Sequence, residues 1–140
     1  VDLPPEEAGD FVETMKTHQL DPIFLLAPTS HRARIERITA AASGFVYYVS
    51  LKGVTGAGHL SLDSVRDKLA EIRSCTGLPV GVGFGIKDAE TAAAMSKIAD
   101  AVVVGSALVS RIEANLEHPW QAIADINTLL GEMRSAMDAD

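Results

Sequence analysis

The chain has 140 residues, of which 47% are apolar, and its formal net charge is −7. That length suffices for one packed core, and the scattered basic residues of so acidic a chain argue against nucleic acid as a partner. The apolar runs are only a few residues long, so no membrane span is predicted. A single cysteine, Cys75, and an acidic start unlike a secretory signal favour a cytoplasmic location.

Strands and helices are expected to alternate along the chain. Residues 1–3 resemble the end of a strand, and Pro4 and Pro5 are expected to open a helix with Glu6 and Glu7 in its first turn. β-Branched, aromatic and apolar residues predict strands at 22–27, 45–50, 78–84 and 99–105. Apolar spacings of three and four, with their start signals, predict helices over about 28–44, after Ser61, over about 88–98 and 106–116, and from Pro119 onward.

Strict strand–helix alternation indicates an α/β fold with a parallel sheet and helical crossovers. Two architectures fit, an open doubly wound sheet and part of a (β/α)8 TIM barrel. A full barrel needs about 250 residues, so as a barrel this chain is roughly the second half, from the end of strand 4 to the final helix. Residues 1–140 are then expected to form a single partial β/α-barrel domain. Because the chain starts without methionine, we expect a fragment or a processed chain.

Three glycine-rich loops directly follow predicted strands: KGVTGAG at 52–58, GFGIKD at 83–88 and GSAL at 105–108. The first lacks the Gly-Lys-Ser/Thr of a P-loop, and the second lacks the third glycine of a dinucleotide fingerprint. GSAL places Ser106 and its neighbouring N–H groups at a helix start, which suits an anion, although a simple Ser N-cap is the commoner use. Because the last two loops of a barrel often bind phosphate, we expect a small phosphorylated substrate.

Glycines recur at every second residue of one predicted strand, at Gly81, Gly83 and Gly85. Alternate residues share a face of a strand, so this face carries almost no side chains. Either the gap receives the body of the substrate, or a large residue opposite fills it, as in a tight barrel interior.

Other candidate residues carry weaker signals. Lys52 ends a strand, where a Schiff-base lysine could lie, but an exposed loop lysine is the favoured interpretation. Asp2, also at a strand end, fits a catalytic carboxylate about as well as a helix-start or loop-ordering role. The four histidines lack metal-ligand spacing and are expected on the surface or at helix ends, so no metal site is predicted. Trp120 is expected to pack on the outside of the sheet, and either Tyr47 or Tyr48 to face the pocket.

The stretches VDLPPEE, SLKGVTGA, VGFGIKD and VVVGSALV, in this order and spacing, resemble the second half of the tryptophan synthase alpha chain family. The resemblance covers nearly the whole chain. It implies a barrel lyase that cleaves indole-3-glycerol phosphate to indole and glyceraldehyde 3-phosphate in tryptophan biosynthesis. It also implies a heterotetramer with a beta chain that carries pyridoxal phosphate, and no cofactor in this chain.

By position, the resemblance assigns seven residues to the substrate: Tyr47 near the reacting end, Thr55 on a mobile loop, Phe84 lining the pocket, and Gly56, Gly85, Gly105 and Ser106 holding the phosphate. The family's catalytic Glu and Asp lie in the first half of the barrel. We therefore expect no catalytic residue beyond an assisting role for Tyr47, and a chain that is inactive by itself. Where the family often has Arg before GVTG, this chain has Leu51 and Lys52, so Lys52 replaces that loop contact or it is lost.

Two alternatives stay open at this point. One is another phosphate-binding β/α-barrel enzyme, an epimerase or a Schiff-base aldolase that uses Lys52. The other is a non-catalytic half-barrel that binds a partner or associates with itself, because open sheet edges invite pairing.

Overall fold

The structure, a computed structural model, describes residues 3–50, 62–83 and 85–139. Its strands form one parallel sheet in the order β1-β2-β3-β4, with β1 at Phe24–Leu26, β2 at Val46–Val49, β3 at Val80–Gly83 and β4 at Ala101–Val103. The crossovers are α2 (Arg32–Ala41), α3 (Leu62–Arg73) and α4 (Ala89–Ser96). A 3₁₀ turn, η1 (Pro5–Glu7), and α1 (Gly9–Thr17) precede β1, and α5 (Ser106–Ala114) and α6 (Pro119–Asp138) follow β4.

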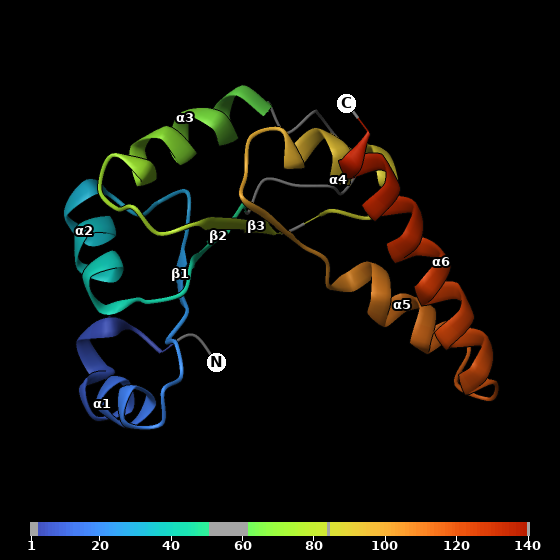
Figure 1. Ribbon diagram of the computed structural model, residues 1–140, viewed down its shortest axis with the longest axis horizontal. Coiled ribbons are helices and arrows are strands. Elements are labelled where there is room, and N and C mark those ends of the chain that lie inside the picture. The colour runs from blue at the N-terminus through green and yellow to red at the C-terminus, as the bar shows by residue number, and fades with distance from the viewer. Residues whose placement is uncertain (1–2, 51–61, 84, 140) are drawn as a thin grey trace.

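The strand order decides between the two predicted architectures. A doubly wound sheet reverses its order at a switch point, whereas here each strand pairs with the next one in the chain. Figure 1 shows the sheet following an arc, with α2, α3 and α4 on its outer side. Sequential order, parallel pairing and this curvature are those of a barrel wall.

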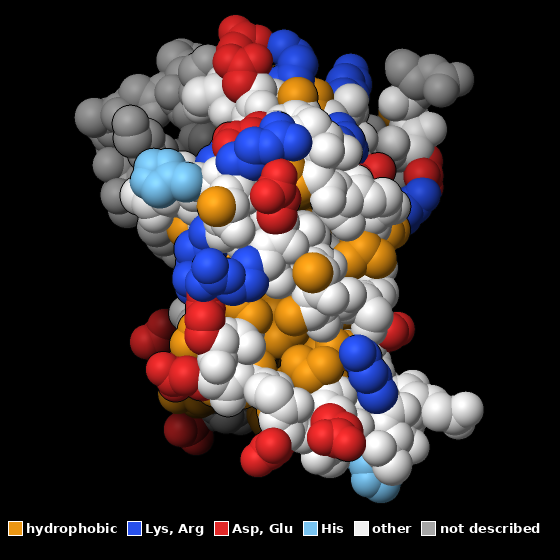
Figure 2. All heavy atoms as spheres, turned by 90° about the vertical axis from the view of Figure 1, so that its left-hand side faces the viewer, with side chains coloured by type: hydrophobic (Ala, Val, Ile, Leu, Met, Phe, Trp, Pro, Cys, Tyr) orange, Lys and Arg blue, Asp and Glu red, His pale blue; other side chains and the backbone are white. Residues whose placement is uncertain are grey.

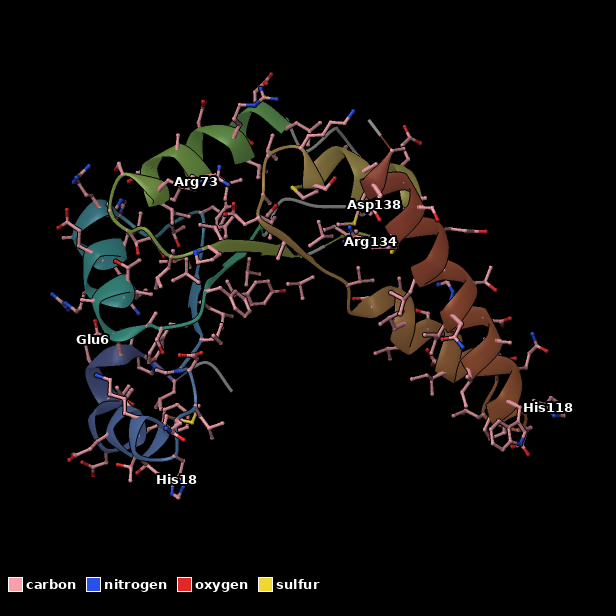
Figure 3. All side chains as sticks on the ribbon, viewed as in Figure 1. Glu6, His18, Arg73, His118, Arg134 and Asp138 are labelled. Carbon is pink, nitrogen blue, oxygen red and sulfur yellow. The ribbon has the colours of Figure 1, made fainter. Side chains whose placement is uncertain are left out.

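The prediction that one helix opens at Pro4 and Pro5 is wrong in one respect. This segment forms two separate elements, the 3₁₀ turn η1 and the helix α1. The Glu7 N–H donates to the Pro4 carbonyl at 3.0 Å, a bond that closes the tighter 3₁₀ turn, and α1 begins only at Gly9. Arg34 and Arg37 of α2 donate to the Glu6 carboxylate at 3.0 and 2.9 Å. These bonds, near the Glu6 label in Figure 3, attach the turn to α2.

The core lies between the sheet and the helices on its outer side. Buried apolar side chains from alternate strand positions pack against buried positions of α2, α3 and α4; they include Leu26, Val46, Val80, Val82, Ile35, Ile38, Leu69, Ile72 and Met95. The opposite, inner face carries one row of register partners, Leu25, Tyr47, Gly81 and Ala101, and a second row, Val49, Gly83 and Val103. The inner face of a barrel wall is where the interior side chains belong.

The outer surface of the helices is polar. Figure 2 shows positive and negative side chains interspersed over α1, α2 and α3. Arg32 pairs with Glu36 at 3.0 Å on α2, and Arg66 pairs with Asp63 at 2.6 Å on α3. All four side chains are largely exposed, so these ion pairs serve solubility more than stability.

Candidate anion-binding site at the carboxyl edge of the sheet

Two glycine-containing turns lie side by side at the carboxyl edge of the sheet. Gly83 of β3 pairs with Val103 of β4, so the turns that follow these strands share one edge. Gly85 in the first turn has φ +80°, a conformation that favours glycine. Gly105 in the second turn is the N-cap of α5. The turns that carry Gly85 and, on the other strand, Gly105 and Ser106 thus follow neighbouring strands at one edge of the sheet.

The first turn of α5 offers backbone donors without a side-chain cap. The N–H groups of Leu108 and Val109 donate to the Gly105 carbonyl at 2.9 and 3.2 Å, which leaves the amides of Ser106 and Ala107 ahead of them at the helix start. Ser106 is exposed and is the first helical residue, so the alternative of a Ser106 N-cap is wrong. A Cβ on Gly105 would meet no atom of the described residues within 4 Å. Open space, free-standing amides and the positive end of the helix dipole suit a phosphate.

The first turn of α4 is closed by its own side chains. The Thr91 N–H donates to the Asp88 carboxylate at 2.9 Å, and the Asp88 N–H donates to the Thr91 hydroxyl at 3.3 Å, which completes a capping box. The hydrogen bonds from the Thr91 hydroxyl and amide hold the pKa of Asp88 below its ordinary value. This helix start therefore carries an anion already, and a ligand can take only the backbone of the preceding turn around Gly85.

Aromatic rings fill the glycine face of β3. A Cβ on Gly81 would lie 3.2 Å from the Phe45 ring, and a Cβ on Gly83 would lie 2.6 Å from Cε2 of Tyr47. The expectation that Gly81 and Gly83 leave room for the substrate is therefore wrong, because neighbouring rings occupy that space. The filling side chains come from the adjacent strand rather than from across the interior. The sequence contains a signal for this packing. Phe45 and Tyr47 are two residues apart, as Gly81 and Gly83 are, so the two rings can lie over the two glycines of a neighbouring strand.

The two adjacent tyrosines lie on opposite faces of β2, as the strand period requires. Tyr48 is buried on the helix side, and this burial raises the pKa of its hydroxyl. Tyr47 lies on the inner face, two residues before Val49 at the carboxyl end of β2, and its ring reaches Gly83 of β3. Of the two tyrosines, Tyr47 is therefore the one on the inner face of the sheet.

The opposite edge of the sheet is fastened by side chains. The Asp100 carboxylate accepts the Val80 N–H at 2.9 Å and the Arg73 guanidinium at 3.0 Å, and Arg73 also donates to the Ile98 carbonyl at 3.0 Å. The Val80 N–H, and then Arg73, hold the pKa of Asp100 below its ordinary value. Figure 3 marks Arg73 on α3. Polar contacts at this amino edge stabilise a barrel, whereas those at the carboxyl edge serve ligands.

A separate cavity of about 460 Å³ lies on the helix side of the sheet, lined by Tyr48, Ser50 and Lys68 among others. The Lys68 ammonium already donates to the Ser30 carbonyl at 2.5 Å and to Glu71 at 2.8 Å. Its charge is thus compensated within the chain, and the cavity is a weaker candidate for an anion than the start of α5.

Histidines and Trp120 lie away from the carboxyl edge. His18, His31 and His118 are exposed and sit at helix ends, as predicted, and Figure 3 shows His18 and His118 at the far ends of α1 and α6. Trp120 is 83% exposed, so the expectation that it packs on the sheet is wrong. The described ranges contain no group of three His, Cys, Asp or Glu side chains placed to hold a metal ion. Nor does any helix in them have the length and apolar character to cross a bilayer.

Several predicted site residues lie outside the described residues: Asp2, Lys52, Thr55, Gly56, Phe84 and His59. Their predicted roles stay predictions.

A parallel strand–helix wall whose strands pair in chain order defines a β/α-barrel protein. The uncapped backbone donors at its carboxyl edge suit an anion. The family model of the tryptophan synthase alpha chain matches residues 1–138. The chain is 63% identical over 138 residues to the tryptophan synthase alpha chain of Thioalkalivibrio sulfidiphilus, and 60% identical over 139 residues to that of Methylococcus capsulatus. The chain belongs to the tryptophan synthase alpha chain family.

Solved structures support the same assignment. The structure is similar to the tryptophan synthase alpha subunit of Legionella pneumophila, with a TM-score of 0.84 and 37% identity over 99% of this chain and 50% of that one. A Mycobacterium tuberculosis tryptophan synthase gives a TM-score of 0.81 and 34% identity over the same shares. The four-stranded sheet is thus half of a (β/α)8 barrel. The matched region takes in 99% of this chain but only 52% of the length of each of these two curated relatives.

Proposed function

We propose that this chain is the phosphate-binding half of a tryptophan synthase alpha subunit, a lyase that cleaves indole-3-glycerol phosphate to indole and glyceraldehyde 3-phosphate. The observation that carries the proposal is the uncapped start of α5 beside Gly85, within a chain whose family is known. The family match argues against the epimerase and aldolase alternatives.

In this proposal the amides of Ser106 and Ala107, with the dipole of α5, hold the phosphate. Gly105 lets the phosphate approach the backbone because no Cβ stands in the way. Tyr47 lies deeper on the inner face and faces the organic part of the substrate. Thr55, Gly56 and Phe84 complete the substrate contacts. A retro-aldol cleavage needs one group to protonate the indole carbon and another to take the hydroxyl proton. We place both in the other half of the barrel, so this chain is inactive by itself.

The partner and location also belong to the proposal. We propose a heterotetramer with a tryptophan synthase beta chain that carries pyridoxal phosphate, and a cytoplasmic site of action. The family assignment supports the beta-chain partner, because the related Mycobacterium tuberculosis structure is described as tryptophan synthase as a whole.

A chimera tests this function. The part of the Thioalkalivibrio sulfidiphilus alpha chain that this chain does not match is joined to residues 1–140, and indole release from indole-3-glycerol phosphate is measured. We expect the chimera to release indole, and each of its two parts by itself to release none. A folded chimera without activity, or activity of the 140-residue chain by itself, would contradict the proposal.

A further inference from the structure

The cavity of about 460 Å³ on the helix side of the sheet, here called the helix-side cavity, has a buried floor and an exposed rim. The buried residues Tyr48, Ser50 and Val65 form the floor. Exposed side chains of the turn after β1 and of α3 form the rim: Pro28, Ser64 and Asp67. β2 pairs with β1 on one side and with β3 on the other, so the floor lies within the sheet and not at its edge. A cavity of this size with a few polar groups among apolar ones is typical of small-molecule sites.

A hydroxyl group at the floor has no hydrogen-bond partner in the described part of the chain. The Ser50 side chain is 2% exposed, and its Oγ is buried without a bond to any described residue. Tyr48 lies two residues earlier on the same face, and burial raises the pKa of its hydroxyl. Folded proteins rarely leave a buried hydroxyl unpaired, because losing its hydrogen bonds to water costs stability. A molecule in the cavity would supply the partner that the fold does not.

Lys68 adds a third polar group and sets the charge of the cavity. Its side chain is 13% exposed, and its ammonium group donates to the Ser30 carbonyl at 2.5 Å and to Glu71 at 2.8 Å. An ammonium group has three N–H donors, so one is left after these two bonds to described residues. Glu71 balances the positive charge, and Asp67 at the rim adds a negative one. This charge distribution disfavours an anionic ligand, whereas an uncharged oxygen could accept from the hydroxyl and ammonium donors.

We propose that the helix-side cavity binds a small uncharged organic molecule, whose carbonyl or hydroxyl oxygen bonds to Ser50 and whose apolar body packs on Tyr48 and Val65. This site is separate from the phosphate site at α5, because the cavity lies on the helix side of the sheet, opposite the inner face that carries Tyr47. Its ligand would contact Lys68, which joins the turn after β1 to α3. The proposal does not rest on the lyase function.

Three probes that share one ring but differ in the head group test the class of ligand: benzyl alcohol, benzoate and benzylamine. Each is titrated into the isotope-labelled chain and followed by NMR, with glycerol 3-phosphate present throughout. We expect benzyl alcohol to shift the amides of Ser50, Val65 and Lys68 saturably, with a Kd in the millimolar range that is usual for so small a molecule. Benzoate should bind at least about 10-fold more weakly, because its carboxylate would be buried near Glu71. Benzylamine should also bind more weakly, because its ammonium group would compete with Lys68 for Glu71.

Ser50→Ala separates a binding role from a structural one. The change removes a hydroxyl that makes no hydrogen bond to a described residue, so the variant should unfold at the same urea concentration as the parent or a higher one. Its affinity for benzyl alcohol should fall about 10-fold, the effect of one lost hydrogen bond. Ser50→Thr keeps the hydroxyl and should bind within a few-fold of the parent. Ser30→Ala is the matched control for stability, because Ser30 is also buried but accepts the Ala27 N–H at 3.1 Å; it should unfold at a lower urea concentration.

Three results would overturn the proposal: no saturable shift around the cavity with any probe, which would mean that it holds only water; tighter binding of benzoate than of benzyl alcohol; or a Ser50→Ala variant that loses stability and keeps its affinity. Benzyl alcohol shifts confined to Ser106 and Ala107 would place the probe at α5 and would also contradict it. Failure of glycerol 3-phosphate to shift those two amides would contradict the phosphate site alone, because the cavity uses different residues.

Discussion

Two neighbouring strand–helix units, β3–α4 and β4–α5, have the same topology but differently capped helix starts. Each is a parallel strand followed by a turn with glycine and a helix. In the β3–α4 unit, the Asp88 carboxylate caps the helix, and Tyr47 lies over the glycine at the end of the strand. In the β4–α5 unit, Gly105 caps the helix without a side chain, and no described residue lies within 4 Å of a Cβ placed on it.

This difference shows how a fold separates stability from binding. In both helices, the amides of the first turn have no hydrogen-bond acceptor within the helix itself. Where a side chain satisfies them, the helix start contributes to stability and repels a further anion. Where glycine and serine leave them unsatisfied, the helix start keeps its capacity for a ligand, at some cost in stability.

The largest expected effect comes from closing α5 with a charge. Ser106→Asp should weaken glycerol 3-phosphate binding about 100-fold or more, because a carboxylate would compete for the amides and repel the phosphate. Titration calorimetry measures the change. Ser110→Asp, one turn further along the exposed part of α5, adds the same charge to the same helix and should bind within a few-fold of the parent. Equal affinities for the two variants would count against a site at α5.

Filling the glycine of the β3–α4 unit should destabilise the chain. Gly83→Ala places a methyl group within the Tyr47 ring contact and should lower the free energy of unfolding by about 1–3 kcal/mol. The matched change Gly105→Ala enters open space at φ −122°, so it should change that free energy by less than about 0.5 kcal/mol. Urea denaturation distinguishes them. The contrast would fail if both variants were equally stable.

Opening α4 should have a smaller effect. Asp88→Ala removes the acceptor for the Thr91 N–H and should cost about 1 kcal/mol of unfolding free energy, while Asp88→Asn retains a capping oxygen and should cost less. Thermal unfolding at neutral pH provides the measurement. Neither variant should gain or lose glycerol 3-phosphate binding; a clear change in affinity would mean that α4 takes part in the site.

The smallest effect is on the pH dependence of stability. The folded-state pKa of Asp88 lies below its ordinary value of 3.8, so the unfolded chain binds its proton more readily. The stabilisation by Asp88 is therefore fully present above about pH 5 and is lost as the pH falls through the folded pKa. The advantage of the parent over Asp88→Asn should shrink on acidification below about pH 4. If the stability advantage of the parent over Asp88→Asn increased on acidification instead, this account of the pH dependence would be wrong.

The sequence predicted the elements well because their signals are local. Alternating strands and helices, the Asp88 cap and the glycine–serine start of α5 each depend on a few adjacent residues. It failed where contacts join distant residues: the rings of Phe45 and Tyr47 over Gly81 and Gly83 follow from strand pairing, and the exposure of Trp120 depends on which surface is covered. The single-domain boundary at 1–140 stays a prediction.

The most direct test of the contrast between the two units is an NMR titration of the labelled chain with glycerol 3-phosphate. We predict saturable shifts of the Ser106 and Ala107 amides, with the Thr91 amide unmoved because Asp88 already accepts from it. Shifts at the start of α4 without shifts at α5, or no saturable shift at either helix, would contradict the account.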